Sequence, residues 1–257
     1  MPIPKKIHYC WFGYGEKSEL VKRCIASWKQ FCPDYKIIEW NEQNYDVKKN
    51  EYMHQAYQAQ RWGFVSDFAR LDIVYQHGGI YLDTDVELVK NLDTLLEADG
   101  FFGFERPVGP TDLYMVNSGQ GFGACAGNAV VLKMLEAYKS RQFIRQDGTI
   151  DLTTCPTYNT EVLKTLGLQT DNTPQKICGV RIYPAEYFCP LSWRNKKCVI
   201  TKNTYSIHHF NASWLSDREK RRRKSTRQVD YFIHIPNMLL KRILGESKYN
   251  SIKKKFK

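Results

Sequence analysis

The order of apolar and polar positions at the start of the chain predicts a strand, a helix and a second strand. Residues 6–12 are a β-prone run that stops at two glycines, and Ser18 is placed to cap a helix extending to about residue 31. Residues 35–40 follow a Pro-Asp turn and form the second strand. Because a helix that connects two strands is the usual start of a parallel sheet, this opening predicts an α/β fold.

Two helices and an unusual strand are predicted next. Residues 50–60 and 63–76 form the helices, and the second carries a stripe of four apolar residues before Gly78 ends it. Residues 80–90 then predict a strand that acidic residues interrupt. The remaining elements are predicted to be strands at 101–104, 180–183 and 198–201 and helices at 128–138 and 158–166.

The composition fits a folded α/β domain. The chain has 257 residues, of which 42% are hydrophobic, enough for a substantial core. It has no run of 18 apolar residues, and its first residues lack the apolar segment of a signal peptide, so we expect a cytoplasmic protein. None of the eight cysteines forms a C-x-x-C pair, and none has the Cys/His spacing of a structural zinc site. We therefore expect reduced, mostly buried thiols.

Positive charge is concentrated near the C-terminus. The net charge is +11, and residues 215–257 hold 14 Lys or Arg against 4 acidic residues, which accounts for +10 of it. This asymmetry predicts a nearly neutral domain at 1–214 and a basic, partly helical tail at 215–257. The tail has three interpretations: a solvated helix, a nucleic-acid site or an anionic membrane contact. Since apolar residues are interspersed among the charges and no nucleic-acid motif accompanies them, we favour a membrane surface contacted by residues 218–257.

Two carboxylates within the predicted strand at 80–90 are candidates for chemistry. Asp83 and Asp85 are two positions apart, so on a strand they share a face with Tyr81 and repel each other unless a cation lies between them. Oxygen ligands of this kind suit Mg²⁺ or Mn²⁺. A D-x-D pair alone is more often a solvated strand end, so its surroundings decide how it is interpreted.

Those surroundings resemble the D-x-D sugar-transfer region of glycosyltransferase family 32. The similarity lies in Ser66-Asp67-Phe68-Ala69-Arg70-Leu71-Asp72 and in Gly78-Gly79-Ile80-Tyr81-Leu82-Asp83-Thr84-Asp85, with further likeness at 7–13 and 207–214. The family includes bacterial capsule-synthesis enzymes and yeast mannosyltransferases, and the pattern also resembles the glucosylating domain of large clostridial toxins. This resemblance implies a GT-A, Rossmann-like fold and the retaining transfer of a hexose from a nucleotide-sugar.

The resemblance also implies a set of donor-site residues. Asp67 and Arg70 match the pair that grips the donor sugar and its phosphates, and Tyr81 matches a tyrosine near the diphosphate. Asp85 matches the direct metal ligand, while Asp83 matches the carboxylate that reaches the ribose and supports the metal. The implied cofactor is therefore Mn²⁺ or Mg²⁺.

Further residues match the family at the edges of this site. Trp11 matches the aromatic residue that stacks on the nucleotide base, and Asn117 matches a position facing the donor hexose. His209 matches a third metal ligand, although the adjacent His208 could take that role, because neighbours on an extended segment face opposite ways. Trp214 matches a tryptophan that closes over the leaving diphosphate.

The expected reaction follows from the resemblance. A UDP-hexose is the implied donor, and a glycan or a lipid-linked saccharide is the implied acceptor, as in capsular or surface polysaccharide synthesis. The glycines at 119–123 match neither common phosphate-loop pattern, so we interpret them as room for the sugar beside the sheet. Two alternatives stay open: a metal-dependent nucleotide-sugar phosphohydrolase and a non-catalytic membrane or nucleic-acid adaptor.

Overall fold

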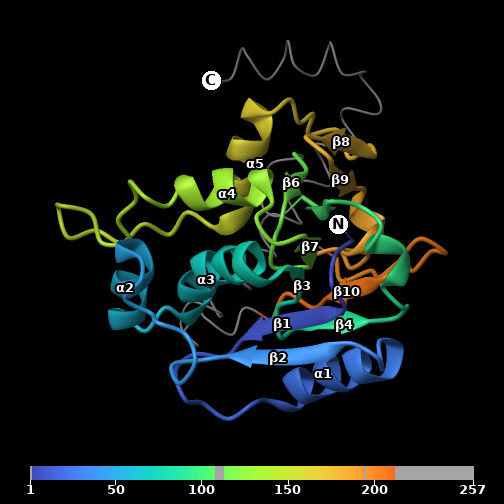
Figure 1. Cartoon of the computed structure of the whole chain (residues 1–257), viewed down its shortest axis with the longest axis horizontal. Coiled ribbons are helices and arrows are strands. Elements are labelled where there is room, and N and C mark those ends of the chain that lie inside the picture. The colour runs from blue at the N-terminus through green and yellow to red at the C-terminus, as the bar shows by residue number, and fades with distance from the viewer. Residues whose placement is uncertain (1, 108–112, 194, 212–257) are drawn as a thin grey trace.

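A mixed β-sheet runs through the centre of the protein (Figure 1). The computed structural model describes residues 2–107, 113–193 and 195–211. The strands follow one another across the sheet as β2 (Lys36–Trp40), β1 (Lys6–Cys10), β3 (Gly79–Tyr81), β7 (Phe122–Ala124), β5 (Gly100–Glu105), β9 (Val180–Tyr183) and β8 (Gln175–Ile177), with β6 (Met115–Val116) paired to β5. Strand β1 is parallel to β2, as the opening of the sequence predicted, and it is also parallel to β3. The predicted α/β fold class is confirmed.

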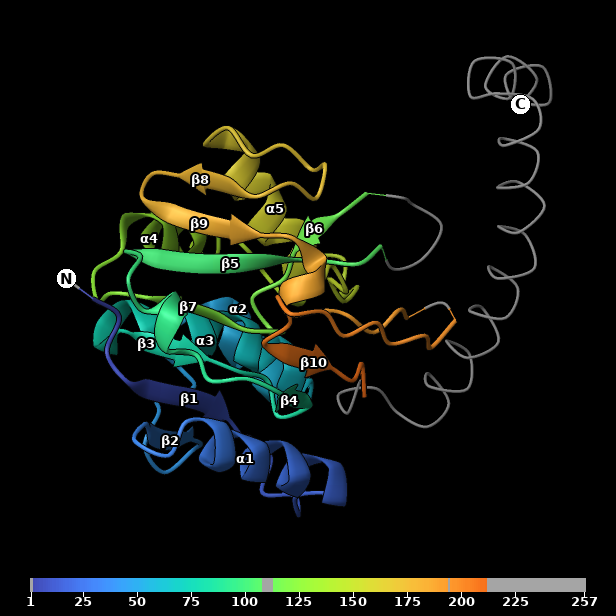
Figure 2. The same cartoon turned by 90° about the vertical axis from the view of Figure 1, so that its right-hand side faces the viewer.

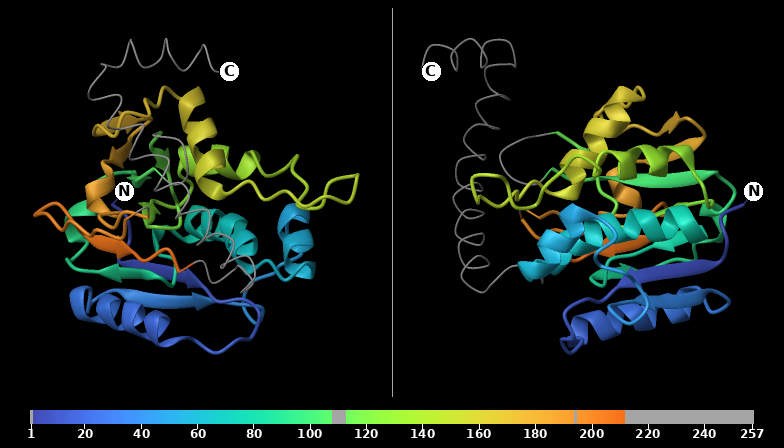
Figure 3. Two further views of the ribbon diagram at one scale, coloured as in Figure 1. Left: turned by 180° about the vertical axis from the view of Figure 1, so that it is seen from behind. Right: turned by 60° about the vertical axis from the view of Figure 1, so that its left-hand side comes forward.

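Helices cover both faces of this sheet (Figures 1 and 3). Alternate strand residues enter two separate cores, so that Ile7 packs on one face and Cys10 on the other. Helix α1 packs into the first core, whereas the four other helices pack into the second. Their bounds are α1 (Glu19–Phe31), α2 (Glu51–Gln58), α3 (Trp62–His77), α4 (Ala129–Glu136) and α5 (Cys155–Thr165), with 3₁₀ turns η1 (Asp93–Leu95) and η2 (Ala185–Tyr187).

Local capping explains where several helices begin and end. The Ser18 hydroxyl accepts from the backbone N–H of Val21 at the start of α1, and Asn128 caps α4 in the same way. Gly78 ends α3 at a φ of 58°, a left-handed value that glycine adopts without strain. These ends agree with the predicted helices to within a few residues.

The strand predicted at 80–90 is divided in two. After β3 the chain turns at 84–85 and forms β4 (Val86–Leu88), which pairs antiparallel with β10 (Ser206–His208) in a separate two-stranded sheet. Asp83 and Asp85 therefore lie in the connection between the two strands, and the prediction that they share one strand face is wrong. Figure 2 shows the β4–β10 pair at the side of the sheet toward which β1 points.

Two other predictions near the end of the described chain need correction. No strand forms at 198–201, where Cys198 makes only an isolated bridge with Leu191. Strand β10 forms instead, a few residues later. Among the described residues, no helix has the length and apolar character needed to span a bilayer. The predicted basic tail, its membrane contact and Trp214 lie outside the described residues.

Candidate active site

One cleft of about 420 Å³ opens where β1, β3 and β5 end. In α/β sheets, ligands bind beyond the carboxyl ends of the strands. The cleft is lined by residues that follow these strands, by α3, by the start of α5 and by the end of β10; among them are Trp11, Asp67, Arg70, Asp83, Asp85, Asn117 and His208. The fold thus brings together, at one place, most of the site residues predicted from the sequence.

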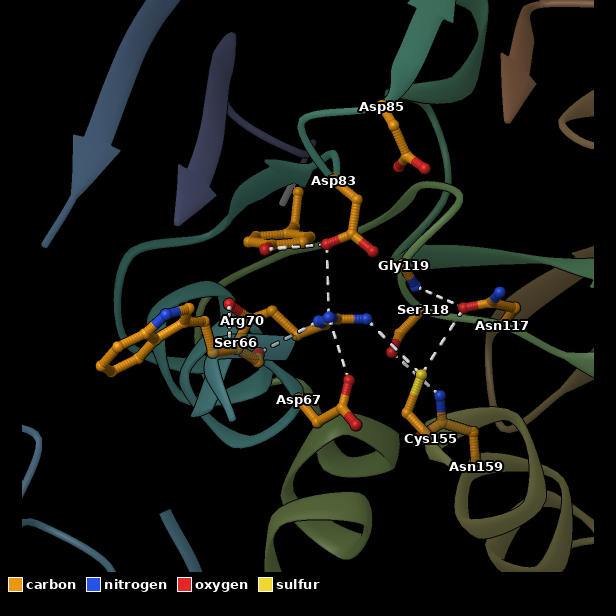
Figure 4. A network of polar contacts seen from close by, with 12 residues as sticks. Ser66, Asp67, Arg70, Asp83, Asp85, Asn117, Ser118, Gly119, Cys155 and Asn159 are labelled. Atoms are coloured by element: carbon orange, nitrogen blue, oxygen red, sulfur yellow. Dashed lines mark hydrogen bonds and ion pairs between the residues drawn. The ribbon is translucent and has the colours of Figure 1, made fainter. Parts of the chain in front are cut away.

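Arg70 on α3 is the centre of the polar network in this cleft (Figure 4). Its side chain is 3% exposed, and its Nη2 lies 3.0 Å from Asp67 Oδ1 and 3.2 Å from Asp83 Oδ1. Its Nε donates to the backbone oxygen of Ser66 at 3.0 Å, which fixes the direction of the guanidinium plane. Burial lowers the pKa of Arg70, but Asp83 and Asp67 outweigh it and hold the pKa well above its usual value. The site therefore contains a permanent, rigidly held positive charge.

Both carboxylates beside Arg70 have a pKa above the usual value of an aspartate. Burial raises the pKa of Asp67 to about 6, even though Arg70 lowers it. Burial likewise raises the pKa of Asp83, whose Oδ1 accepts a hydrogen bond of 3.0 Å from the Tyr81 hydroxyl. Tyr81 also lies under the guanidinium, with its ring centre 5.1 Å from Arg70 Cζ. Tyr81 is thus a support for the ion pair.

Gly119 makes room for the same ion pair. A Cβ atom at this position would lie 2.3 Å from Asp83 Oδ2 and 2.8 Å from Arg70 Nη1. The backbone oxygen of Gly119 also accepts from the Asp83 N–H at 3.0 Å. The glycines at 119–123 were interpreted from the sequence as room for the sugar. At Gly119 this needs correction, because the space there is taken by the Asp83–Arg70 pair.

Asp85 faces His208 rather than His209. His208 Nε2 lies 3.5 Å from Asp85 Oδ1, whereas the ring of His209 is turned to Glu87, with 2.7 Å between Nε2 and Oε2. The backbone N–H of Asn211 donates to Asp85 Oδ2 at 2.8 Å. The ring beside Asp85 is thus that of His208, the alternative that the sequence left open, while a metal-binding role for either histidine stays a prediction.

Asp85 and His208 are the donors here that fit a divalent cation. A carboxylate and an imidazole suit Mn²⁺, and His208 is 8% exposed with its Nδ1 buried and unpaired. Asp83 Oδ1 is already engaged by Arg70 and Tyr81. In residues 2–107, 113–193 and 195–211, no group of three or more His, Cys, Asp or Glu has the spacing of a metal site. Of the three predicted metal ligands, Asp85 has the His208 ring beside it, Asp83 pairs with Arg70 and His209 contacts Glu87.

Trp11 and Asn117 lie in the wall of the cleft. The Trp11 indole N–H donates to the Gly15 backbone oxygen at 2.7 Å, which leaves the ring beside the cleft. Asn117 is 6% exposed, and its Oδ1 accepts from the Gly119 N–H at 2.7 Å. Both positions are compatible with the donor contacts that the resemblance implied.

Sequence reasoning missed the start of α5, where Thr154, Cys155 and Pro156 line the cleft. The helix was predicted to begin at residue 158, yet it begins at Cys155. Thr154, followed two positions later by Pro156, is a recognised helix-start signal that would have placed the start of α5 correctly. Glu105, at the end of β5, is a second cleft residue that was missed, and the short strand carried no signal for it.

Comparison with known proteins identifies the segment that builds most of this site. Residues 18–102 match the sequence model of the glycosyltransferase sugar-binding region containing a DXD motif. Inositol phosphoceramide mannosyltransferase 3 of Schizosaccharomyces pombe is 29% identical over 118 residues, which cover 42% of this chain and 31% of that protein. The chain thus matches less than a third of the length of this relative.

Comparison with solved structures finds glycosyltransferases, at low similarity. The PaToxG glycosyltransferase is 23% identical, with a TM-score of 0.44 over 64% of this chain and 70% of its own. The galactosyltransferase LgtC, solved with donor and acceptor sugar analogues, is 15% identical, with a TM-score of 0.40 over 87% of this chain and 95% of its own. Structural similarity at this level carries no conclusion about function.

The matched segment contains α3, β3 and the turn after β3, which hold Asp67, Arg70, Asp83 and Asp85 at the cleft. These elements come from one continuous stretch of sequence, and the fold places their polar side chains at one end of the sheet. The part of the chain that matches the glycosyltransferase sugar-binding region with a DXD motif is thus the part that holds the polar centre of the cleft.

Proposed function

We propose that this protein is a metal-dependent glycosyltransferase that moves a hexose from a nucleotide-sugar to an acceptor hydroxyl. The observation that carries the proposal is the buried Arg70, held between Asp67 and Asp83 in the same cleft as the Asp85–His208 pair. A fixed cation beside a carboxylate–imidazole pair suits a ligand with a diphosphate and a sugar. The match to a sugar-binding region supports the same ligand class.

Arg70 would stabilise the leaving nucleoside diphosphate. As the bond to the anomeric carbon breaks, negative charge develops on the departing phosphate oxygen. Because Ser66, Asp67 and Asp83 already fix the guanidinium, it need not reorganise when that charge appears. A buried donor of this kind acts in a low dielectric, where its interaction with the charge is stronger than in water.

Asp85 and His208 would hold the cation. Mn²⁺ or Mg²⁺, when bound there, supplies further neutralisation of the diphosphate. The Asn211 N–H orients the Asp85 carboxylate, and the strand pairing of β10 with β4 fixes the direction of His208. Because the protein supplies two donors, the remaining coordination positions stay available to diphosphate oxygens and water.

The finer parts of the proposal extend the same site. Trp11 would stack on the base, and Asp67 with Asn117 would face the hexose. We keep a UDP-hexose as donor, a saccharide or lipid-linked acceptor in surface polysaccharide synthesis, and retention by a front-face route in which the departing phosphate oxygen takes the acceptor proton. Location in the cytoplasm, with the tail on the inner membrane face, belongs to the same proposal.

A product analysis tests this function. The full chain is incubated with Mn²⁺ and a panel of nucleotide-sugars, with and without a mixed pool of saccharide acceptors, and the products are separated and weighed by mass spectrometry. A transferase releases a nucleoside diphosphate and adds one hexose to an acceptor. A phosphohydrolase acting on the same donor instead releases a nucleoside monophosphate and a sugar phosphate. Absence of any donor cleavage across the panel would overturn both assignments.

A further inference from the structure

Cys155 bridges two side chains of the cleft that face different parts of the proposed donor. Its Sγ lies 3.5 Å from Arg70 Nη1 and 3.6 Å from Asn117 Oδ1 (Figure 4). It is the first residue of α5, is 6% exposed and lines the cleft. The thiol thus contacts the arginine expected at the diphosphate and the amide expected at the sugar.

The amide of Asn117 has one orientation in this network. The backbone N–H of Gly119 points to it at 2.7 Å and is a donor only, so the atom it meets must be Oδ1. Cys155 lies on the same oxygen. Because Oδ1 faces Gly119 and Cys155, the NH₂ group of Asn117 is on the side of the cleft. Within the described part of the chain, this NH₂ group donates no hydrogen bond to another residue.

The protonation state of Cys155 agrees with a donating role. Burial, followed by the nearby Asp67 carboxylate, raises the pKa of the thiol well above its usual value, although Arg70 lowers it. The group therefore remains S–H at neutral pH. Its hydrogen is available to Asn117 Oδ1, while its sulfur accepts from the Arg70 guanidinium.

We propose that Cys155 is a positioning residue that holds the Asn117 amide in register with Arg70, so that both N–H groups of the amide are presented to an oxygen of the donor sugar. The inference rests on the proposed function, because it needs a nucleotide-sugar in the cleft. Cys155 would thus take no part in the chemical step and would contribute to recognition of the sugar rather than of the nucleotide.

Substitution of the thiol should therefore separate sugar recognition from nucleotide recognition. Cys155→Val keeps much of the volume but has no donor, so Asn117 Oδ1 keeps only its bond from the Gly119 N–H and the amide is held less firmly beside Arg70. We expect the affinity for the nucleotide-sugar to fall about threefold to tenfold, the effect of one neutral hydrogen bond. The affinity for the free nucleoside diphosphate should stay within about twofold of wild type, since Asp67 and Asp83 still hold Arg70. Cys155→Ser, which restores an O–H donor, should recover part of the loss.

The experiment is a calorimetric titration of each full-length variant, with Mn²⁺ present, against the donor identified by the product analysis and against its free nucleoside diphosphate. Cys24→Ala is the matched control, because Cys24 is also a buried thiol but lies on α1 in the other core. Its two affinities should equal those of wild type. Thermal unfolding of all variants checks that each is folded at the temperature of titration.

The outcomes are distinct. A loss confined to the nucleotide-sugar and partly reversed by Cys155→Ser supports the inference. Equal weakening of both ligands, no weakening, or a Cys155→Ser variant as poor as Cys155→Val overturns it while leaving the proposed function intact. If Cys155→Val does not fold, Cys155→Ala, which also has no donor, takes its place, and an unchanged ratio of the two affinities in that variant contradicts a positioning role. Failure of wild type to bind any nucleotide-sugar would overturn the proposed function itself.

Discussion

Single residues in the cleft are arranged so that each charge has a fixed neighbour. Arg70 is enclosed by Asp67 and Asp83, and Asp85 is oriented by the Asn211 N–H and by His208. Such pairs are costly to break, because an unpaired buried charge is left behind. At this scale, the contacts of individual side chains predict which substitutions affect the reaction and which do not.

The two adjacent histidines should differ sharply in their effect. His208→Ala removes the imidazole beside Asp85 and should weaken Mn²⁺ activation of donor cleavage by about tenfold to a hundredfold, as expected for the loss of a metal ligand or its support. His209→Ala removes only the contact with Glu87 and should change Mn²⁺ activation by less than about threefold. Titrating activity with Mn²⁺ in both variants tests this order. A reversed order would restore His209 as the metal-facing ring.

Gly119→Ala should disable the site even where the chain still folds, because Asp67 continues to pair with Arg70. The added Cβ would lie 2.3 Å from Asp83 Oδ2, so the carboxylate must leave its position beside Arg70. We expect donor cleavage to fall at least about tenfold, since misplacement of a reacting group by about 1 Å costs up to a hundredfold. Steady-state kinetics, with circular dichroism to confirm the fold, measures this. Wild-type turnover in Gly119→Ala would show that the Asp83–Arg70 geometry does not matter.

Secondary-structure elements were predictable where their ends are signalled locally. Helices α1 and α4 begin at the side-chain caps Ser18 and Asn128, and α3 ends at Gly78. Strands β4 and β10 were not resolved from the sequence, because each has only three residues and exists through pairing with a distant partner. That pairing also decides which of the two adjacent histidines faces Asp85, so the sequence could leave this choice only open.

At the scale of the elements, His8 joins three of them and makes their packing sensitive to acid. Its Nδ1 accepts from the Trp40 indole on β2 at 3.1 Å, so its Nε2–H donates to the Gly78 backbone oxygen at 2.8 Å. Burial lowers the pKa of His8 from 6.5 to about 4. The contribution of neutral His8 to the free energy of unfolding is therefore fully present above pH 6.5 and is lost as the pH falls through 4. The shift corresponds to about 3 kcal/mol at most.

The free energy of unfolding should therefore decrease between pH 6.5 and 4, and the decrease should be shallower in His8→Gln, which has no titrating ring. Urea unfolding at a series of pH values measures both slopes. His54→Gln is a suitable control, because His54 lies on α2 and has no recorded contact with this cluster. Identical slopes in wild type and His8→Gln would exclude His8 as the source of acid sensitivity.

For the whole molecule, the fold class and the centre of the site could be predicted, whereas the rest of the cleft could not. Asp67, Arg70, Asp83 and Asp85 come from one continuous motif, so their proximity is largely local. Cys155 reaches them only because α5 packs against the same core as α3. Periodicity indicates an element but not which distant element it meets, and therefore the α5 wall of the cleft appeared only in the structure.

The charge asymmetry of the whole chain predicts that its basic C-terminal segment binds anionic membranes. A chain truncated after residue 214 loses a formal charge of +10 and should lose most binding to vesicles containing anionic lipid. Full-length binding should weaken strongly between about 0.1 M and about 1 M salt, where the screening length falls from about 10 Å to about 3 Å. Vesicle sedimentation of both chains measures this. Equal sedimentation of the truncated chain would contradict the membrane role, and neutral vesicles serve as the control.

The most direct test of the central claim is donor cleavage by Asp85→Asn. In the proposed function, the cleft at the ends of β1, β3 and β5 binds a nucleotide-sugar through a cation at Asp85. Release of nucleoside diphosphate is measured with Mn²⁺ for wild type, for Asp85→Asn and for Asp171→Asn, an exposed acid that accepts hydrogen bonds from Thr173 and Gln175 and is not among the cleft residues. We predict a loss of at least about a hundredfold in Asp85→Asn, matched by EDTA treatment of wild type, and full activity in Asp171→Asn. Wild-type release by Asp85→Asn would contradict the account.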